Sequence, residues 1–399
     1  MNNKKNIFLS FLIYGLGLLA LLISDLYVNQ SFSSDEIADY TFIKSSIFIL
    51  GGLSLMGYEQ VFIRDLSLIK REFTTFLVRT IIISLIFCYS IFHIKNYSPL
   101  FCTVFFFSII FFSLLSYYAA SYRAEFKLIA SQVATNLWKI FFLLLLVLWV
   151  STVEYFFLVS LLIVFILCFI YEQKASVNRK GYSFELDNNT AKRLGFTFLL
   201  SNLTLIFANY GEQFIINIFN KSFISSNLFG YYATYTPIAL SMNGFIGFYL
   251  GPKIKQNTIV ESRFFKKLNL KIFISSLLFT TVSIIFGYLY NSYITKAEQI
   301  DFNIISITLL FILCVIRGIY ISSSVFLGVY AEYGDLYKVA ILFSIITVIY
   351  CISIYLILNF FDGIFAVQLI LLSSVLNWLA RYLTSNFFTL KIIKKHVNG

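Results

Sequence analysis

Eight ionisable residues lie inside long apolar stretches of this 399-residue chain, where a charge is hardest to accommodate. On membrane-insertion scales each costs about 2.5 to 3.5 kcal/mol at the middle of a bilayer, so each is a candidate functional residue. Basic side chains at this depth can bind anionic groups, and carboxylates can bind protons or cations. The residues are Asp25, Lys44, Glu59, Arg79, Lys139, Glu212, Arg317 and Arg381.

Several of these charges also have a purely structural explanation. Asp25 and Lys44 lie near the outer ends of consecutive apolar runs, which favours an interhelical salt bridge over a transport role. Arg79 and Arg317 lie near the cytoplasmic side, where long side chains can reach the headgroups, so anchoring and cavity lining are equally good interpretations. Arg381 is given no site role, because a last helix often packs at the periphery.

The stretch GYEQVFIRD, residues 57–65, ends the second apolar run. If 41–63 is one helix, Lys44 and Glu59 share a side of it, and that side should avoid lipid. Arg64 then marks the cytoplasmic exit, where gating and ordinary headgroup anchoring are equally good explanations.

The seventh apolar run, 194–217, carries a row of amide side chains at helical spacing, with Glu212 beside them. A single asparagine in a membrane helix usually bonds to a neighbouring helix. A row of amides exceeds what one packing contact needs, which favours a wet, polar cavity wall. The predicted wall consists of Asn202, Asn209, Gln213 and Asn217.

The elements that position these residues are predicted to be membrane-spanning helices. Hydrophobic residues make up 59% of the chain and charged residues only 12%, about half the share in soluble proteins. The apolar runs are nearly continuous, about twelve in number and long enough to span, which favours a helical bundle over a barrel. Pro237, in the run 229–250, is expected to remove one helical hydrogen bond and to kink its helix. The predicted fold is an all-α integral membrane protein with about 12 transmembrane helices.

A basic, polar loop divides the predicted spans into two sets of six. The predicted organisation is an N-terminal lobe at 1–172, a cytoplasmic linker at 173–193 and a C-terminal lobe at 194–399. Most basic residues fall in one set of loops, which predicts that both termini are cytoplasmic. The opposite set of loops carries only Lys95, Lys221 and Lys296.

Motifs for enzyme, cofactor or metal chemistry are missing from the sequence. It has no GxxxxGK[ST] loop, no HExxH helix and no GxSxG elbow, and its five cysteines stand singly. We therefore expect a protein that is not an enzyme and that needs neither cofactor nor metal. The net charge of +11 suits contact with anionic membrane lipids, which leaves no reason to expect nucleic acid as a partner.

Five motifs, spread in order along the chain, carry a family resemblance. They are FSSDEIADYTFI, GYEQVFIRD, NYGEQFI, NLFGYYATYTPI and LGVYAEYGD. With them the sequence resembles the bacterial polysaccharide or O-antigen flippases of the Wzx type, within the multidrug/oligosaccharidyl-lipid/polysaccharide exporter superfamily.

The resemblance implies two six-helix lobes around a cationic cavity in the bacterial inner membrane. The implied cargo is an oligosaccharide on a polyprenyl diphosphate, an O-antigen or capsule repeat unit, moved from the cytoplasmic to the external leaflet by alternating access. A polymerase and a chain-length regulator are the implied partners. Glu59 and Glu212 are the candidate carboxylates for ion coupling, and the cations that could line the cavity are Lys44, Arg79, Lys139 and Arg317.

Two other functions remain open from the sequence. A membrane-embedded polysaccharide polymerase or ligase has a similar composition, but such enzymes usually present a sizeable external loop, and the outward loops here are short and rich in acids. A drug exporter of the same superfamily would share the fold and carry an acidic cavity. The excess of Lys and Arg over Asp and Glu inside the spans favours an anionic cargo.

Overall fold

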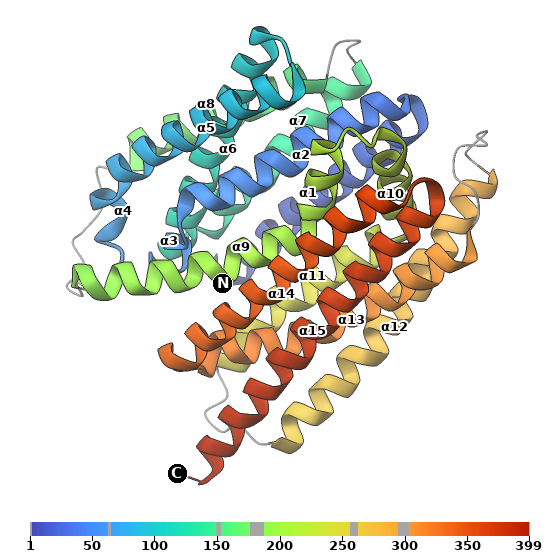
Figure 1. Ribbon diagram of the computed structural model, residues 1–399. Helices are drawn as coiled ribbons and strands as arrows, with labels where there is room; N and C mark the ends of the chain where they lie inside the picture. The colour runs from blue at the N-terminus through green and yellow to red at the C-terminus, as the bar shows by residue number, and fades with distance from the viewer. Residues whose placement is uncertain are drawn as a thin grey trace. The chain divides into compact units, whose positions relative to one another are not determined.

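The protein is helical throughout the computed structural model, which describes residues 2–62, 65–148, 153–175, 187–255, 262–293 and 303–398. Fifteen helices and no strand occur in these ranges (Figure 1). Ten of the helices are long and apolar enough to cross a membrane, since about 20 residues span its hydrocarbon core. They are α1 (Asn2–Ser31), α5 (Phe73–Lys95), α6 (Pro99–Ala124), α7 (Leu128–Leu148), α8 (Val153–Ala175), α9 (Asn188–Ile218), α12 (Ser262–Tyr293), α13 (Ile304–Tyr330), α14 (Tyr333–Phe360) and α15 (Gly363–Asn398).

The predicted all-α multi-pass membrane architecture is thus confirmed, and the two remaining predicted spans are interrupted helices. The span predicted at 41–63 is divided into α2 (Ser34–Leu55) and α3 (Tyr58–Val61), and the span predicted at 229–250 into α10 (Ser222–Tyr235) and α11 (Pro237–Lys255). A single helical turn, α4 (Leu68–Arg71), precedes α5.

The break between α2 and α3 corrects the prediction of one helix through GYEQVFIRD. Met56 and Gly57 both have positive φ, +47° and +74°, so the right-handed helix cannot continue through them. Glu59 lies beyond this break, in α3, and does not share a helix face with Lys44. The expected shared face of the two charges is therefore wrong.

The break is held in place by close packing on α9. A Cβ atom at Gly57 would approach the backbone of Gly195 and Leu199 far more closely than van der Waals contact permits. Beyond the break, Val61 and Phe62 are fully buried in a core that includes Phe76 and Tyr117. Gly57 thus permits both the positive φ at the break and the close approach of α9.

At Pro237 the expected kink is a complete break between two helices. Pro237 is the first residue of α11, where its missing N–H removes no helical hydrogen bond, and α10 ends two residues earlier at Tyr235. The Thr236 hydroxyl between them donates to the Tyr232 carbonyl at 2.8 Å. The second interrupted span therefore has a different cause from the first, a proline rather than a left-handed turn.

The chain forms two compact units. One comprises Met1–Tyr27 and Asp39–Ile206, and the other comprises Val28–Ala38 and Phe207–Gly399. Helices α1, α2 and α9 therefore each contribute residues to both units. Residues 176–186 of the predicted linker lie outside the described residues, and the predicted lobe boundaries stay a prediction.

We predict that Gly57→Ala lowers the melting temperature of the detergent-solubilised protein more than Gly363→Ala does. Both glycines have positive φ, which costs about 1 to 2 kcal/mol for alanine, but nothing lies within 4 Å of a Cβ at Gly363. Overpacking at Gly57 should add about 1 to 3 kcal/mol. Equal melting temperatures for the two variants would show that the contact with α9 is not tight.

Candidate functional site

Glu212 of α9 is a buried carboxylate surrounded by hydroxyl groups from other helices of its unit. Only 4% of the residue is exposed. Tyr350 of α14 donates to its Oε2 at 2.6 Å, Ser374 of α15 donates to the same oxygen, and Tyr232 of α10 is a further hydroxyl partner. The Tyr350 and Ser374 hydroxyls are also 2.8 Å apart. Several helices thus converge on one ionisable group in a span.

Arg317 of α13 also belongs to this cluster. Its Nη2 donates to Asn209 Oδ1 at 2.5 Å, and its guanidinium lies 4.6 Å from the ring centroid of Trp378. Asn209 and Glu212 are three residues apart on α9, so they share a helix face. Arg317 also interacts electrostatically with Glu212, although the two do not form an ion pair in the described structure. The predicted sites Asn209, Glu212 and Arg317 are therefore brought together.

The buried Arg381 of α15 belongs to the same region, although sequence reasoning placed it at the periphery. It is 0% exposed, donates to Thr347 Oγ1 at 2.7 Å, and stacks 4.8 Å from the Phe343 ring centroid. Thr347 lies one turn from Tyr350 on α14. A signal was present in the sequence, since Asn377 and Trp378 precede Arg381 by four and three residues and mark a polar face.

The predicted amide row on α9 is divided between different partners. Gln213 Oε1 accepts from Ser225 at 3.0 Å, whereas its Nε2 is buried without a hydrogen-bond partner in the described structure. Asn217, 2% exposed, donates to the Gln213 carbonyl at 2.8 Å. Asn202 lies in the other compact unit. The assignment of all four amides to one cavity wall stays a prediction.

In the first compact unit, the predicted ion pair between Asp25 and Lys44 is confirmed. Lys44 Nζ lies 2.5 Å and 2.7 Å from the two Asp25 carboxylate oxygens, and Tyr40 donates to the same carboxylate at 2.5 Å. The pair joins α1 to α2. Its presence accounts for Lys44 structurally, and a role for Lys44 in binding cargo stays a prediction.

Lys139 of α7 is a second cation near this pair. It is 8% exposed, its Nζ donates to Asn136 Oδ1 at 2.7 Å, and Asn136 in turn donates to Gln132 at 2.7 Å. No carboxylate of the described residues lies at ion-pair distance from Lys139, but Lys44 is close enough to repel it electrostatically. Two cations and one carboxylate leave this cluster with a net positive charge.

The remaining predicted residues of this unit gather around α3. Glu59 accepts a hydrogen bond from Asn202 of α9, and its backbone carbonyl accepts a weak one from Arg123 at 3.5 Å. The guanidinium of Arg79 lies 5.5 Å from the Tyr58 ring centroid, with a buried Nε that has no hydrogen-bond partner in the described structure. Arg64 lies outside the described residues. The predicted gate residue Glu59 and the predicted wall residue Asn202 are thus direct partners.

The described parts of the chain contain no group of three or more His, Cys, Asp or Glu side chains placed to hold a metal ion. The described groups include hydrogen-bonded cations and the carboxylates of Glu59 and Glu212, which accept hydrogen bonds from neutral polar side chains. That chemistry suits reversible binding of charged groups.

Comparisons with known proteins give a fold. No family model matches the chain, and no curated protein matches it. A solved structure described as a crystal structure of MATE in complex with MaL6 resembles it with a TM-score of 0.50, at 11% sequence identity, over 99% of this chain and 97% of that one. At this identity the likeness concerns the fold alone. The chain is a multi-pass membrane protein with a MATE-like fold.

Proposed function

We propose that this protein is a flippase that moves a polyprenyl-diphosphate-linked oligosaccharide from the cytoplasmic to the external leaflet of a bacterial inner membrane. The resemblance to Wzx-type flippases motivates the cargo, and the MATE-like fold suits a transporter. On this proposal the protein is not an enzyme, and it works by alternating access beside a polymerase and a chain-length regulator.

The observation that carries the proposal is a set of cations kept inside the spans without carboxylate partners. Arg79, Lys139 and Arg317 have no carboxylate at ion-pair distance among the described residues, and only Lys44 is neutralised, by Asp25. Each charge without an ion-pair partner is costly in a membrane, so its retention favours an anionic ligand that neutralises it during transport. A diphosphate has the required charge.

The membrane potential supplies a driving force in the proposed direction. Each negative charge moved outward across an inside-negative membrane gains about 2.3 kcal/mol per 100 mV. A diphosphate headgroup carries more than one such charge, so the potential alone can bias the cargo outward. Ion exchange is then an addition to the mechanism, not a requirement of it.

A second candidate function is export of small organic cations. The buried Glu212, with its hydroxyl neighbours, is the observation that favours it, because a carboxylate without a close cationic partner can bind a positively charged ligand. The MATE-like fold is equally consistent with this function. The sign of the charge on the transported molecule therefore distinguishes the flippase from the cation exporter.

We predict that Lys139→Gln lowers the translocation rate of a lipid diphosphate oligosaccharide in proteoliposomes by at least about tenfold, because a lost hydrogen bond to a charged group is worth about 1.5 to 3 kcal/mol. The measurement is leaflet-resolved accessibility of the labelled glycan. Lys338→Gln, at an exposed lysine, removes the same charge and should leave the rate unchanged. Normal glycan translocation by a folded Lys139→Gln variant would contradict the proposal.

The same vesicles test the second function. Wild-type protein should not transport a fluorescent organic cation. Cation efflux that is abolished by Glu212→Gln, together with an absence of glycan translocation, would contradict the flippase function and support export of organic cations. Glycan chain extension without translocation would instead point to the polymerase or ligase.

We predict that Glu212→Gln abolishes any stimulation of translocation by an imposed proton or sodium gradient, while transport driven by the membrane potential persists. Glutamine keeps the shape of the side chain and accepts hydrogen bonds from Tyr350 and Ser374, but it cannot ionise. Glu332→Gln, at an exposed glutamate, serves as the control. Gradient stimulation that survives in Glu212→Gln and disappears in Glu59→Gln would transfer the coupling role to Glu59.

A further inference from the structure

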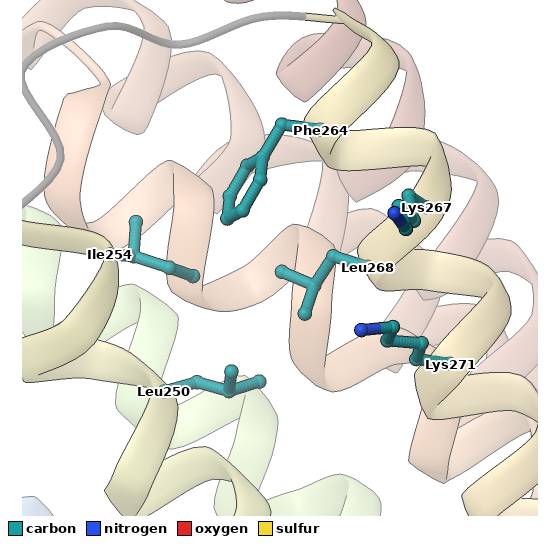
Figure 2. A pocket seen from close by; sticks show the side chains of 6 residues that line it. All are labelled: Leu250, Ile254, Phe264, Lys267, Leu268 and Lys271. Atoms are coloured by element: carbon teal, nitrogen blue, oxygen red, sulfur yellow. The ribbon is translucent and has the colours of Figure 1, made fainter.

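A small groove lies between α11 and α12 and shares no lining residue with the Glu212 cluster of the same unit. Leu250 and Ile254 of α11 face Phe264 and Leu268 of α12 across it, and two lysines of α12 complete its lining (Figure 2). The cavity has a volume of about 150 Å³. Sites for drug-sized ligands start at roughly 300 Å³, so this groove suits one segment of a longer molecule.

The floor of the groove is apolar and firmly held. Leu250 is 7% exposed and Ile254 only 1%. Both belong to a packed cluster that also contains Phe326. Tyr330 of α13 donates to the Ile254 carbonyl at 2.7 Å, which fixes the end of α11. A ligand segment in this groove therefore meets a preformed hydrocarbon surface.

The rim of the groove is cationic. Lys267 and Lys271 are four residues apart, so they lie on one face of α12, and both are exposed. Figure 2 shows the amino group of Lys271 extending toward the groove. Neither lysine forms an ion pair with a carboxylate of the described residues. Two adjacent ammonium groups above an apolar floor are complementary to an anionic headgroup that carries a hydrocarbon chain.

The surroundings of the groove indicate a bilayer lipid as its occupant. Leu270, Ile274 and Leu278 of α12 are 58%, 56% and 55% exposed, which is the pattern of a helix face in contact with acyl chains. These residues continue along the same helix as Lys267 and Lys271. A soluble phosphate would leave the apolar part of the groove unused, whereas a phospholipid occupies both parts.

We propose that this groove binds an anionic phospholipid of the cytoplasmic leaflet, with its phosphate between Lys267 and Lys271 and part of one acyl chain against Leu250, Ile254 and Leu268. The site is separate from the proposed cargo site, because it requires none of the cations assigned to the diphosphate. Its chemistry is that of a bound structural lipid, which stabilises the junction of α11 and α12.

Native mass spectrometry of the full-length, detergent-solubilised protein tests the proposal, with phosphatidylglycerol and phosphatidylcholine as probes. Wild type should retain phosphatidylglycerol preferentially. The double variant Lys267→Gln, Lys271→Gln should bind it about 30-fold more weakly, since each lysine near a membrane surface contributes about a factor of five. Leu268→Trp, which fills the groove but keeps both lysines, should also lose the lipid.

The matched control is Arg263→Gln with Lys266→Gln, which removes two charges from the same turns of α12 but from outside the groove. Its loss of affinity should be no more than a few-fold. An equal loss in the two double variants would reduce the site to general surface attraction and overturn the proposal. Equal retention of phosphatidylcholine, or displacement of phosphatidylglycerol by an equimolar polyprenyl diphosphate, would also overturn it.

Discussion

Hydrocarbon cannot solvate a charge, so every ionisable side chain inside a span must be satisfied by groups from the protein itself. Most of the polar geometry in this molecule follows from that constraint. Glu212 accepts hydrogen bonds from hydroxyl groups of α10, α14 and α15, and Asp25 forms an ion pair with Lys44 of the next helix. Because these partners lie on different helices, each buried charge also fixes how its neighbours pack.

Because of the same constraint, a cation that is kept inside a span indicates a functional role. A protein that only needed packing contacts could use apolar residues at these positions with no loss of stability. Lys139 instead donates a hydrogen bond to Asn136, which in turn donates to Gln132. Arg317 donates to Asn209 and stacks on the ring of Trp378. Neutral groups accept the hydrogen bonds of these cations, and neither cation forms an ion pair in the described structure, which leaves both able to attract an anion.

Helical content and the approximate number of membrane-spanning segments could be predicted from the sequence, because both depend on composition over about 20 residues. The salt bridge of Asp25 and a disturbance of the helix at Pro237 were predictable too, since each has a local signal. The end of α2 at Leu55 was not, because its cause is the packing of Gly57 against α9, nearly 140 residues away in sequence. A lone glycine in an apolar run does not reveal such a contact.

Partners within the candidate site were the least predictable part. Glu212 and Arg317 stood out as charges in apolar runs, whereas Tyr350 and Ser374 are ordinary residues in a chain with 27 tyrosines, and only tertiary packing selects them. Arg381 was misplaced for a related reason. The position of a helix in a bundle depends on its neighbours, and the last helix of this chain is deeply packed around Asn377 and Arg381.

If the buried cations bind an anionic cargo, other anions should compete for them. This is measured by displacement of a radiolabelled lipid diphosphate oligosaccharide from the purified protein, with inorganic pyrophosphate and a tetraalkylammonium ion as the two competitors. We expect pyrophosphate to displace the labelled lipid and the ammonium ion to leave it bound. Displacement by the ammonium ion alone would contradict an anionic cargo.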